Sequence, residues 1–136
     1  MGIQIYLGGP LFSQAEIDWG RQIKAFLLRR IINVEVVWPY EIPSRSKKEA
    51  FHANLDALKN CDLMVAILDG PQVDDGTAWE IGHFYSQGKK ILGIRTDSRR
   101  AGEFIDSAVN LMVECSCYAI AENLDCLAAE LKRLQY

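Results

Sequence analysis

The sequence predicts an α/β protein: a flavodoxin-like three-layer sandwich with a five-stranded parallel sheet of order 2-1-3-4-5. Five short apolar runs recur along the chain, and most of them lack the alternation of a half-exposed strand. Segments with helical spacing separate these runs, and strands that alternate with helices form parallel sheets. With right-handed crossovers, the flavodoxin-like order is the simplest arrangement of five such strands.

The expected strands are rich in Val, Ile and Leu. They are Ile3–Leu7, Val34–Trp38, Leu63–Leu68, Lys90–Ile94 and Leu111–Cys115. The expected helices carry apolar residues on one broad face. They are Ala15–Ile31, Lys47–Lys59, Thr77–Gln87 and Ala121–Leu134. No repeat, low-complexity tract or linker interrupts this pattern, so residues 1–136 are expected to form a single domain.

Composition excludes several classes of protein. Fifteen basic residues against 18 acidic ones give a net charge of −3, which argues against a partner that is a nucleic acid polymer. No apolar run has the length of a membrane-spanning helix, and the N-terminus lacks the features of a signal peptide. The four cysteines lack metal-ligand spacing and are expected to be small buried residues in a reducing compartment. A cytoplasmic protein is therefore expected.

In such a sheet, ligands bind beyond the carboxyl ends of the strands, where the strand order reverses. We expect this rule to gather the first loop, Gly8–Phe12, with Cys61-Asp62 and with the loop Asp69–Asp75. The paired glycines of the first loop allow close approach of a ligand. This loop lacks the Lys-Ser/Thr pair of a phosphate-binding loop, so a phosphate site for FMN or ATP is not expected.

The segment 69–82 holds the residues best suited to catalysis. Asp75 is expected to cap the helix that follows, which places Glu80 near the positive end of the helix dipole and favours its ionised form. Asp74 and Glu80 could both face the crevice. Two carboxyl groups in one crevice are suited to glycosyl chemistry, in which a carboxylate traps an oxocarbenium-like carbon and an acid protonates the leaving group. A solvated turn and helix surface is the alternative interpretation of the same residues.

Four segments, spread from residue 6 to residue 112, carry a more specific signal. They are Tyr6–Phe12, Asn60–Asp62, Asp74–Gly82 with Gly88-Lys89, and Asn110–Met112. Together they resemble the nucleoside 2-deoxyribosyltransferase family, and the Asp-x-Gly-Thr-x-x-Glu-x-Gly stretch is the most specific part.

This resemblance implies a retaining, two-step transfer of 2-deoxyribose between nucleobases, as in nucleoside salvage. Glu80 matches the family's nucleophile, which would form a covalent deoxyribosyl ester. Asp62 matches an aspartate that passes a proton to or from the base, and Tyr6 would orient Glu80 by a hydrogen bond. No cofactor and no metal is implied.

The resemblance also implies how the nucleoside is bound. Gly9 and Phe12 would line the nucleoside cavity, and Asp74 would hold the sugar through its 5′-hydroxyl. Asn110 matches a residue that reaches the 5′-hydroxyl from a neighbouring subunit. A homo-oligomer, a dimer or larger, with shared active sites is therefore expected, and its small-molecule partners would be nucleosides and free nucleobases.

The closest alternative is an N-glycoside hydrolase of 2′-deoxynucleosides or their 5′-monophosphates. A monophosphate would need donors near the first loop, where Ser13 is the single serine and Asp74 would repel the phosphate. A non-catalytic nucleotide-binding domain is a further alternative. The sequence leaves open the preference between purines and pyrimidines, the tolerance of ribose and the role of residues 40–51. The charged stretch Arg95–Arg100 is expected to be a solvated loop.

Overall fold

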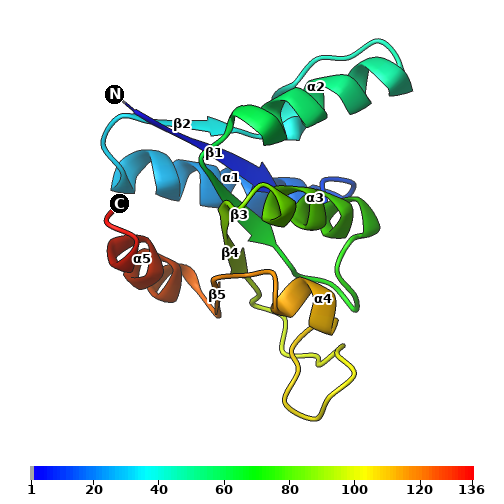
Figure 1. Ribbon diagram of the computed structural model, residues 1–136, viewed down its shortest axis with the longest axis vertical. Helices are drawn as coiled ribbons and strands as arrows, with labels where there is room; N and C mark the ends of the chain where they lie inside the picture. Colours follow the sequence, from blue (N-terminus) through cyan, green and yellow to red (C-terminus); the bar gives the residue numbers. More distant parts are fainter. Residues whose placement is uncertain (1) are drawn as a thin grey trace.

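The computed structural model describes residues 2–136 (Figure 1). The strands are β1 (Ile3–Gly8), β2 (Val34–Val37), β3 (Leu63–Ile67), β4 (Lys90–Ile94) and β5 (Ala119–Ala121). The helices are α1 (Gln14–Arg30), α2 (Lys47–Asn60), α3 (Asp75–Ser86), α4 (Leu111–Glu114) and α5 (Leu124–Arg133), with a 3-10 turn, η1 (Pro39–Glu41). All four strand pairs are parallel and the order is β2-β1-β3-β4-β5, which confirms the predicted flavodoxin-like sheet.

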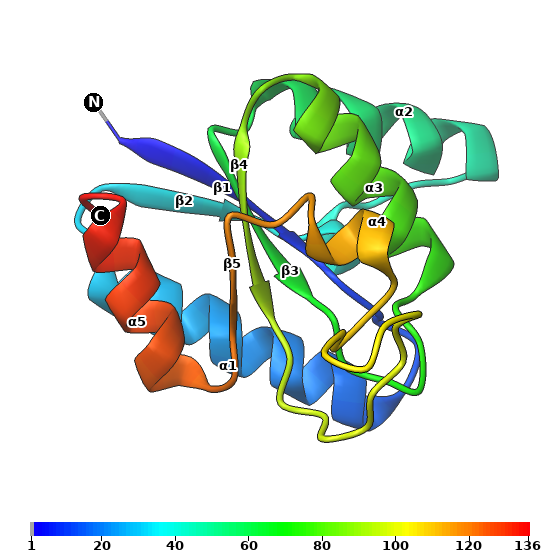
Figure 2. The ribbon, with the colours of Figure 1, turned by 60° about the horizontal axis from the view of Figure 1, so that its bottom comes forward.

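Helices cover both faces of this sheet, so the predicted three-layer sandwich is also confirmed (Figure 2). Helices α1 and α5 pack on one face, where Ile23 and Leu127 meet strand residues such as Leu92. Helices α2, α3 and α4 lie on the other face, where Ile81 and Phe84 meet the second set of strand side chains. Because both faces are covered, strand β3 is buried along its whole length, which explains its continuous apolar sequence.

The helix starts follow from capping chemistry. Ser13 caps α1 and forms a reciprocal capping box with Glu16, whose carboxylate accepts the Ser13 N–H at 2.8 Å. Ser46 caps α2 by accepting from the Glu49 N–H, and Asn123 caps α5 by accepting from the Cys126 N–H. The predicted helix Ala121–Leu134 therefore starts later than expected, at Leu124, because Ala121 still belongs to strand β5.

The fifth predicted strand was wrong. Residues 111–114 form the short helix α4, and the fifth strand is Ala119–Ala121 instead. Asn110 starts the helix by accepting a hydrogen bond from the Met112 N–H at 2.9 Å, and Val113 is the buried residue of that turn. The actual strand is only three residues long, so its apolar signal is too short to recognise in the sequence.

The cysteines are not all buried, contrary to expectation. Cys61 is buried and Cys117 is half-buried, but Cys115 and Cys126 are exposed. All four are free thiols. Within residues 2–136, no helix is both long enough and apolar enough to span a membrane.

Candidate active site

A cleft of about 640 Å³ opens between the loop after β1, the face of α2 and the start of α3. Its floor and walls combine apolar side chains from α2 with carboxylates from α3. The residues from the first loop are Gly9, Leu11 and Phe12; those from α2 are Phe51, Asn54, Leu55 and Leu58; those preceding or within α3 are Asp74, Asp75, Gly76, Trp79 and Glu80. Parallel sheets bind ligands at this edge.

The central pair of the cleft is Tyr6 and Glu80. Tyr6 lies in the middle of β1 and is completely buried, and its hydroxyl donates a hydrogen bond to Glu80 Oε2. Gly8 leaves room for this arrangement, because a β-carbon at that position would lie 3.8 Å from Glu80 Oε1 and only 2.6 Å from the Met64 methyl carbon. The structure thus brings together two of the three residues expected to act in catalysis.

The protonation of Glu80 differs from the expectation based on the helix dipole. Burial raises the pKa of Glu80 from 4.5 to about 7, the hydrogen bond from Tyr6 opposes this rise, and the nearby charge of Asp74 adds to it. Loss of hydration is the largest of these three effects. Burial and the charge of Glu80 also raise the pKa of Tyr6 far above its usual value, so Tyr6 stays protonated and remains a donor.

Asp74, rather than Asp75, caps α3. One oxygen of its carboxylate, Oδ2, accepts hydrogen bonds from the Thr77 N–H and the Thr77 hydroxyl, both at 2.9 Å. Within residues 2–136, no hydrogen bond to the other oxygen, Oδ1, is found. Asp75 was expected to be the cap, but it is the first residue of the helix and its carboxylate accepts from the Gly76 N–H at 2.8 Å.

Gly9 and Phe12 both line the cleft, where the resemblance placed them. Gly9 has a φ of +152°, which favours glycine, and a β-carbon there would come within 2.7 Å of Ile67. The Phe12 ring is 75% exposed, so it forms an open rim of the cleft rather than part of the core.

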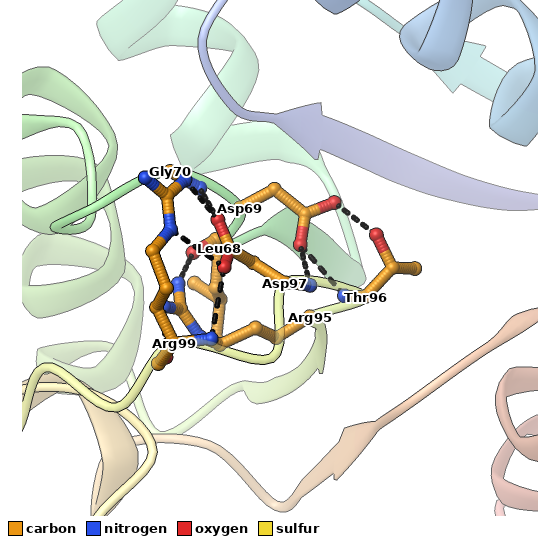
Figure 3. Close-up of polar contacts among 7 residues, drawn as sticks. All are labelled: Leu68, Asp69, Gly70, Arg95, Thr96, Asp97 and Arg99. Carbon is orange, nitrogen blue, oxygen red and sulfur yellow. Dashed lines mark hydrogen bonds and ion pairs between the residues drawn. The ribbon is translucent and has the colours of Figure 1, made fainter.

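A hydrogen-bond network holds the loop that leads to Asp74 (Figure 3). The Asp69 carboxylate accepts from the Thr96 N–H at 2.6 Å, the Thr96 hydroxyl at 2.8 Å and the Asp97 N–H at 2.9 Å. Asp97 in turn accepts from the Gly70 N–H at 3.2 Å. These hydrogen bonds therefore join the loop after β3 to the loop after β4.

Arg95 does not belong to a solvated loop, contrary to expectation. It is only 4% exposed, and its guanidinium donates to the carbonyl oxygens of Leu68 and Arg99. Arg99 itself is exposed and pairs with Asp97, and this contact holds the pKa of Asp97 well below its usual range. The charged side chains of Arg95, Asp97 and Arg99 therefore form hydrogen bonds and an ion pair within the loop after β4 and with Leu68, which follows β3.

The structure separates Asp62 from the cleft. Asp62 immediately precedes β3, so it lies at the amino edge of the parallel sheet, whereas Glu80 lies toward the carboxyl edge. Its exposed carboxylate accepts from the Gln4 N–H at 2.8 Å. The expectation that Asp62 stands at the mouth of the third strand was wrong because a residue before a strand and a residue after it lie at opposite edges.

Asn110 also lies outside the cleft of its own chain. Its side chain caps α4 and its amide donates to Glu103 at 3.2 Å. Exposed apolar side chains lie close to it in the sequence: Phe104, Ile105 and Met112 are 62%, 96% and 70% exposed.

Sequence reasoning missed the contribution of α2. Phe51 and Trp79 meet edge to face with ring centroids 6.1 Å apart, and Asn54 adds an amide to the same cleft. The signal available in the sequence was the spacing of Phe51, Asn54, Leu55 and Leu58, which puts them on one face of a helix. Nothing in that spacing shows whether the face meets the core or a ligand.

A second cleft, of about 770 Å³, lies at the end of β4 and β5 and contains none of the expected site residues. Its lining mixes three arginines, Arg95, Arg99 and Arg100, with acidic residues such as Glu114 and Glu122. Within residues 2–136, no group of three or more His, Cys, Asp or Glu side chains is arranged to hold a metal ion.

The flavodoxin-like sheet carries a half-buried carboxylate, Glu80, in an acidic cleft, and this arrangement is suited to chemistry at a glycosidic bond. The chain belongs to the nucleoside 2-deoxyribosyltransferase family, which matches residues 5–112. It is therefore an enzyme of the nucleoside 2-deoxyribosyltransferase type.

Solved structures share the fold. The 2-deoxyribosyltransferase from Bacillus psychrosaccharolyticus has a TM-score of 0.75 and 24% identity, over 92% of this chain and 90% of its own. The enzyme from Leishmania mexicana has a TM-score of 0.78 and 20% identity, over 96% and 97%. The CMP N-glycosidase BcmB from Clostridium botulinum has a TM-score of 0.61 and 21% identity, over 95% and 98%.

Proposed function

We propose that this protein transfers 2-deoxyribose between nucleobases in nucleoside salvage, through a covalent ester on Glu80. The observation that carries the proposal is the pairing of Glu80 with the buried Tyr6 hydroxyl inside the cleft. A poorly hydrated carboxylate with a pKa near 7 is a reactive nucleophile once ionised, and the single Tyr6 bond fixes one oxygen and orients the other.

In the first step, Glu80 attacks the anomeric carbon, the bond from that carbon to the base nitrogen breaks, and its electron pair leaves with the base. In the second step, the nitrogen of an acceptor base attacks the same carbon and releases the Glu80 carboxylate. Two inversions retain the configuration. Asp74 would accept the 5′-hydroxyl through its free oxygen, while Gly9 and Phe12 enclose the nucleoside.

The charge of the cleft favours nucleosides over their 5′-monophosphates. Among the described residues that line it, three are carboxylates and none is Lys, Arg or His. A phosphate group with its two negative charges would lie unpaired beside Asp74 and Glu80. The 5′-monophosphate form of the hydrolase alternative is therefore disfavoured, even though one structural neighbour is a CMP N-glycosidase. Hydrolysis of nucleosides remains the competing outcome of the test below.

Asn110 lies outside the cleft of its own chain, so it can contact a bound nucleoside only in the cleft of a second copy of the chain. We propose a homo-oligomer in which Asn110 of one subunit approaches the cleft of the next, and the exposed side chains of Phe104, Ile105 and Met112 support such a contact. The four free thiols suit the reducing environment of the cytoplasm, where we place the reaction.

An exchange assay tests the proposed function. Deoxyadenosine and cytosine incubated with the protein should give deoxycytidine and adenine in equal amounts. Release of adenine and free deoxyribose without deoxycytidine would establish a hydrolase instead. Neither reaction would occur with Glu80→Ala, and light scattering on the wild-type protein should report a dimer or a larger assembly.

A further inference from the structure

The polar groups of the cleft are distributed unevenly between its two walls. All three carboxylates, Asp74, Asp75 and Glu80, come from the start of α3. The opposite wall, on α2, presents Phe51, Leu55 and Leu58 with a single polar side chain, Asn54. A sugar with its hydroxyl groups fits the carboxylate wall, and a flat nucleobase with two apolar faces fits the α2 wall.

Among the described residues, no carboxyl group of the cleft lies on the α2 wall, where we place the base. Asp74 Oδ2 accepts hydrogen bonds from the Thr77 N–H and hydroxyl, which hold this carboxyl group at the start of α3, on the wall away from the base. Asp75 accepts from the Gly76 N–H, and Glu80 must be ionised to act as the nucleophile.

The two remaining candidates for an acid are also excluded. Tyr6 is fully buried and its hydroxyl proton is directed at Glu80. Asp62 lies at the opposite edge of the sheet, beside Gln4. The polar side chain with which α2 lines the cleft is the carboxamide of Asn54, whose N–H groups donate hydrogen bonds but are too weakly acidic to transfer a proton.

We propose, building on the proposed function, that the preferred donors are 2′-deoxynucleosides whose base leaves without receiving a proton from the protein. A purine alkylated at N7 is such a base, because it carries a positive charge in the nucleoside. When its C1′–N9 bond breaks, the electron pair moves to the ring and neutralises that charge. The Glu80 oxygen forms the new bond to C1′, and no proton moves in this step. Asn54 binds and orients the base by hydrogen bonds from its amide.

In the second step of the reaction, solvent water accepts the proton that the incoming base loses. An acceptor base such as adenine attacks C1′ through N9, the ester bond to Glu80 breaks, and the N9 proton passes to water. Water in place of the acceptor gives free deoxyribose by the same route.

Comparison of two donors tests the inference. 7-Methyl-2′-deoxyguanosine and 2′-deoxyguanosine differ at N7 by one methyl group, and their turnover is measured as release of the base in the presence of adenine. Glu80→Ala supplies the background, since the methylated nucleoside also decays unaided. A general acid contributes about 10²–10⁴-fold to a rate, so kcat for the methylated donor should exceed that for deoxyguanosine by at least about 100-fold.

A matched pair of variants tests whether the absence of an acid at position 54 limits the reaction of neutral bases. Asn54→Asp should raise turnover of 2′-deoxyguanosine and narrow the ratio between the two donors by at least about tenfold, because a carboxyl group at this position supplies the proton. Asn60→Asp is the same substitution on α2 at an exposed position outside the cleft, and it should leave the ratio unchanged.

The outcomes separate the two proposals. Equal turnover of both donors by the wild-type protein would overturn the inference and leave the proposed function standing. An Asn54→Asp variant that folds and binds deoxyguanosine but keeps the wild-type ratio would overturn it as well. If neither donor is consumed faster than by Glu80→Ala, the proposed function itself fails.

Discussion

Replacement of Tyr6 by Phe measures how the tyrosine hydroxyl tunes Glu80. The change removes one oxygen from a fully buried side chain and preserves most of its volume. A hydrogen bond to an ionised group contributes about 1.5–3 kcal/mol, and about 1.4 kcal/mol corresponds to one pH unit. The pKa of Glu80, about 7 in the wild-type protein, should therefore rise in Tyr6→Phe by about one to two pH units.

This change predicts a specific pH dependence. The wild-type rate should increase as the pH rises through about 7, because only the ionised carboxylate attacks. In Tyr6→Phe the midpoint should move to higher pH, which lowers the rate at pH 7 by about 5- to 50-fold and restores most of it at alkaline pH.

The assay is the pH–rate profile of the exchange between deoxyadenosine and cytosine. Tyr85→Phe, an exposed tyrosine on α3, is the matched control and should retain the wild-type midpoint. A rate that falls by the same factor at every pH would refute the reasoning, because Tyr6 would then orient Glu80 without influencing its ionisation. A midpoint that moves to lower pH would refute it as well.

Substitutions at three other residues test the roles of Glu80 as nucleophile, of Asp74 as helix cap and sugar ligand, and of Asp62 outside the cleft. Glu80→Gln should abolish exchange. The pKa of Glu80 is higher in the folded than in the unfolded protein, so the free energy of unfolding of the wild type should fall as the pH rises from 4.5 to about 7. At pH 8, calorimetry should find Glu80→Gln more stable than the wild type by at most about 3 kcal/mol. The same pH dependence of stability in both proteins would contradict this. Asp74→Ala should lose about 1 kcal/mol of stability because it removes the cap of α3, whereas Asp74→Ser keeps a capping oxygen. Both variants should raise KM for the nucleoside. A wild-type KM in Asp74→Ser would show that Asp74 only caps the helix. Asp62→Asn should change kcat/KM by less than about tenfold, because loss of a general acid costs about 10²–10⁴ and Asp62 instead holds the Gln4 N–H.

The fold was largely predictable because burial on both faces leaves a direct trace in the sequence. Strand β3 reads as an unbroken apolar run and is buried throughout. The error at residues 111–115 has the same origin. Val113 is buried as part of a helical turn, and a short apolar run looks alike in a buried strand and in a buried helical turn. The cap by Asn110 was the local signal that distinguishes the two.

The site was predictable where it depends on one segment and not where it depends on the meeting of several. The stretch from Asp74 to Glu80 and the first loop carry their chemistry in the sequence, and both line the cleft. Asn54 has no such signal, since its role follows from the packing of α2 against α3. Asp62 shows the reverse case, in which a suitable residue type was assigned to the wrong edge of the sheet.

The ionisation of Glu80 depends on opposing effects that no sequence pattern contains. Burial in the cleft and the nearby charge of Asp74 disfavour its charge, and the Tyr6 hydroxyl favours it. If burial alone acted, the carboxyl group would be protonated at neutral pH and could not attack; if it were fully hydrated, it would be ionised but a weaker nucleophile. With both effects present, the pKa lies near 7, where a substantial fraction of the molecules carry an ionised but poorly hydrated carboxylate. The position of Tyr6 in the interior of β1 thus sets the pH range over which the proposed nucleophile can act.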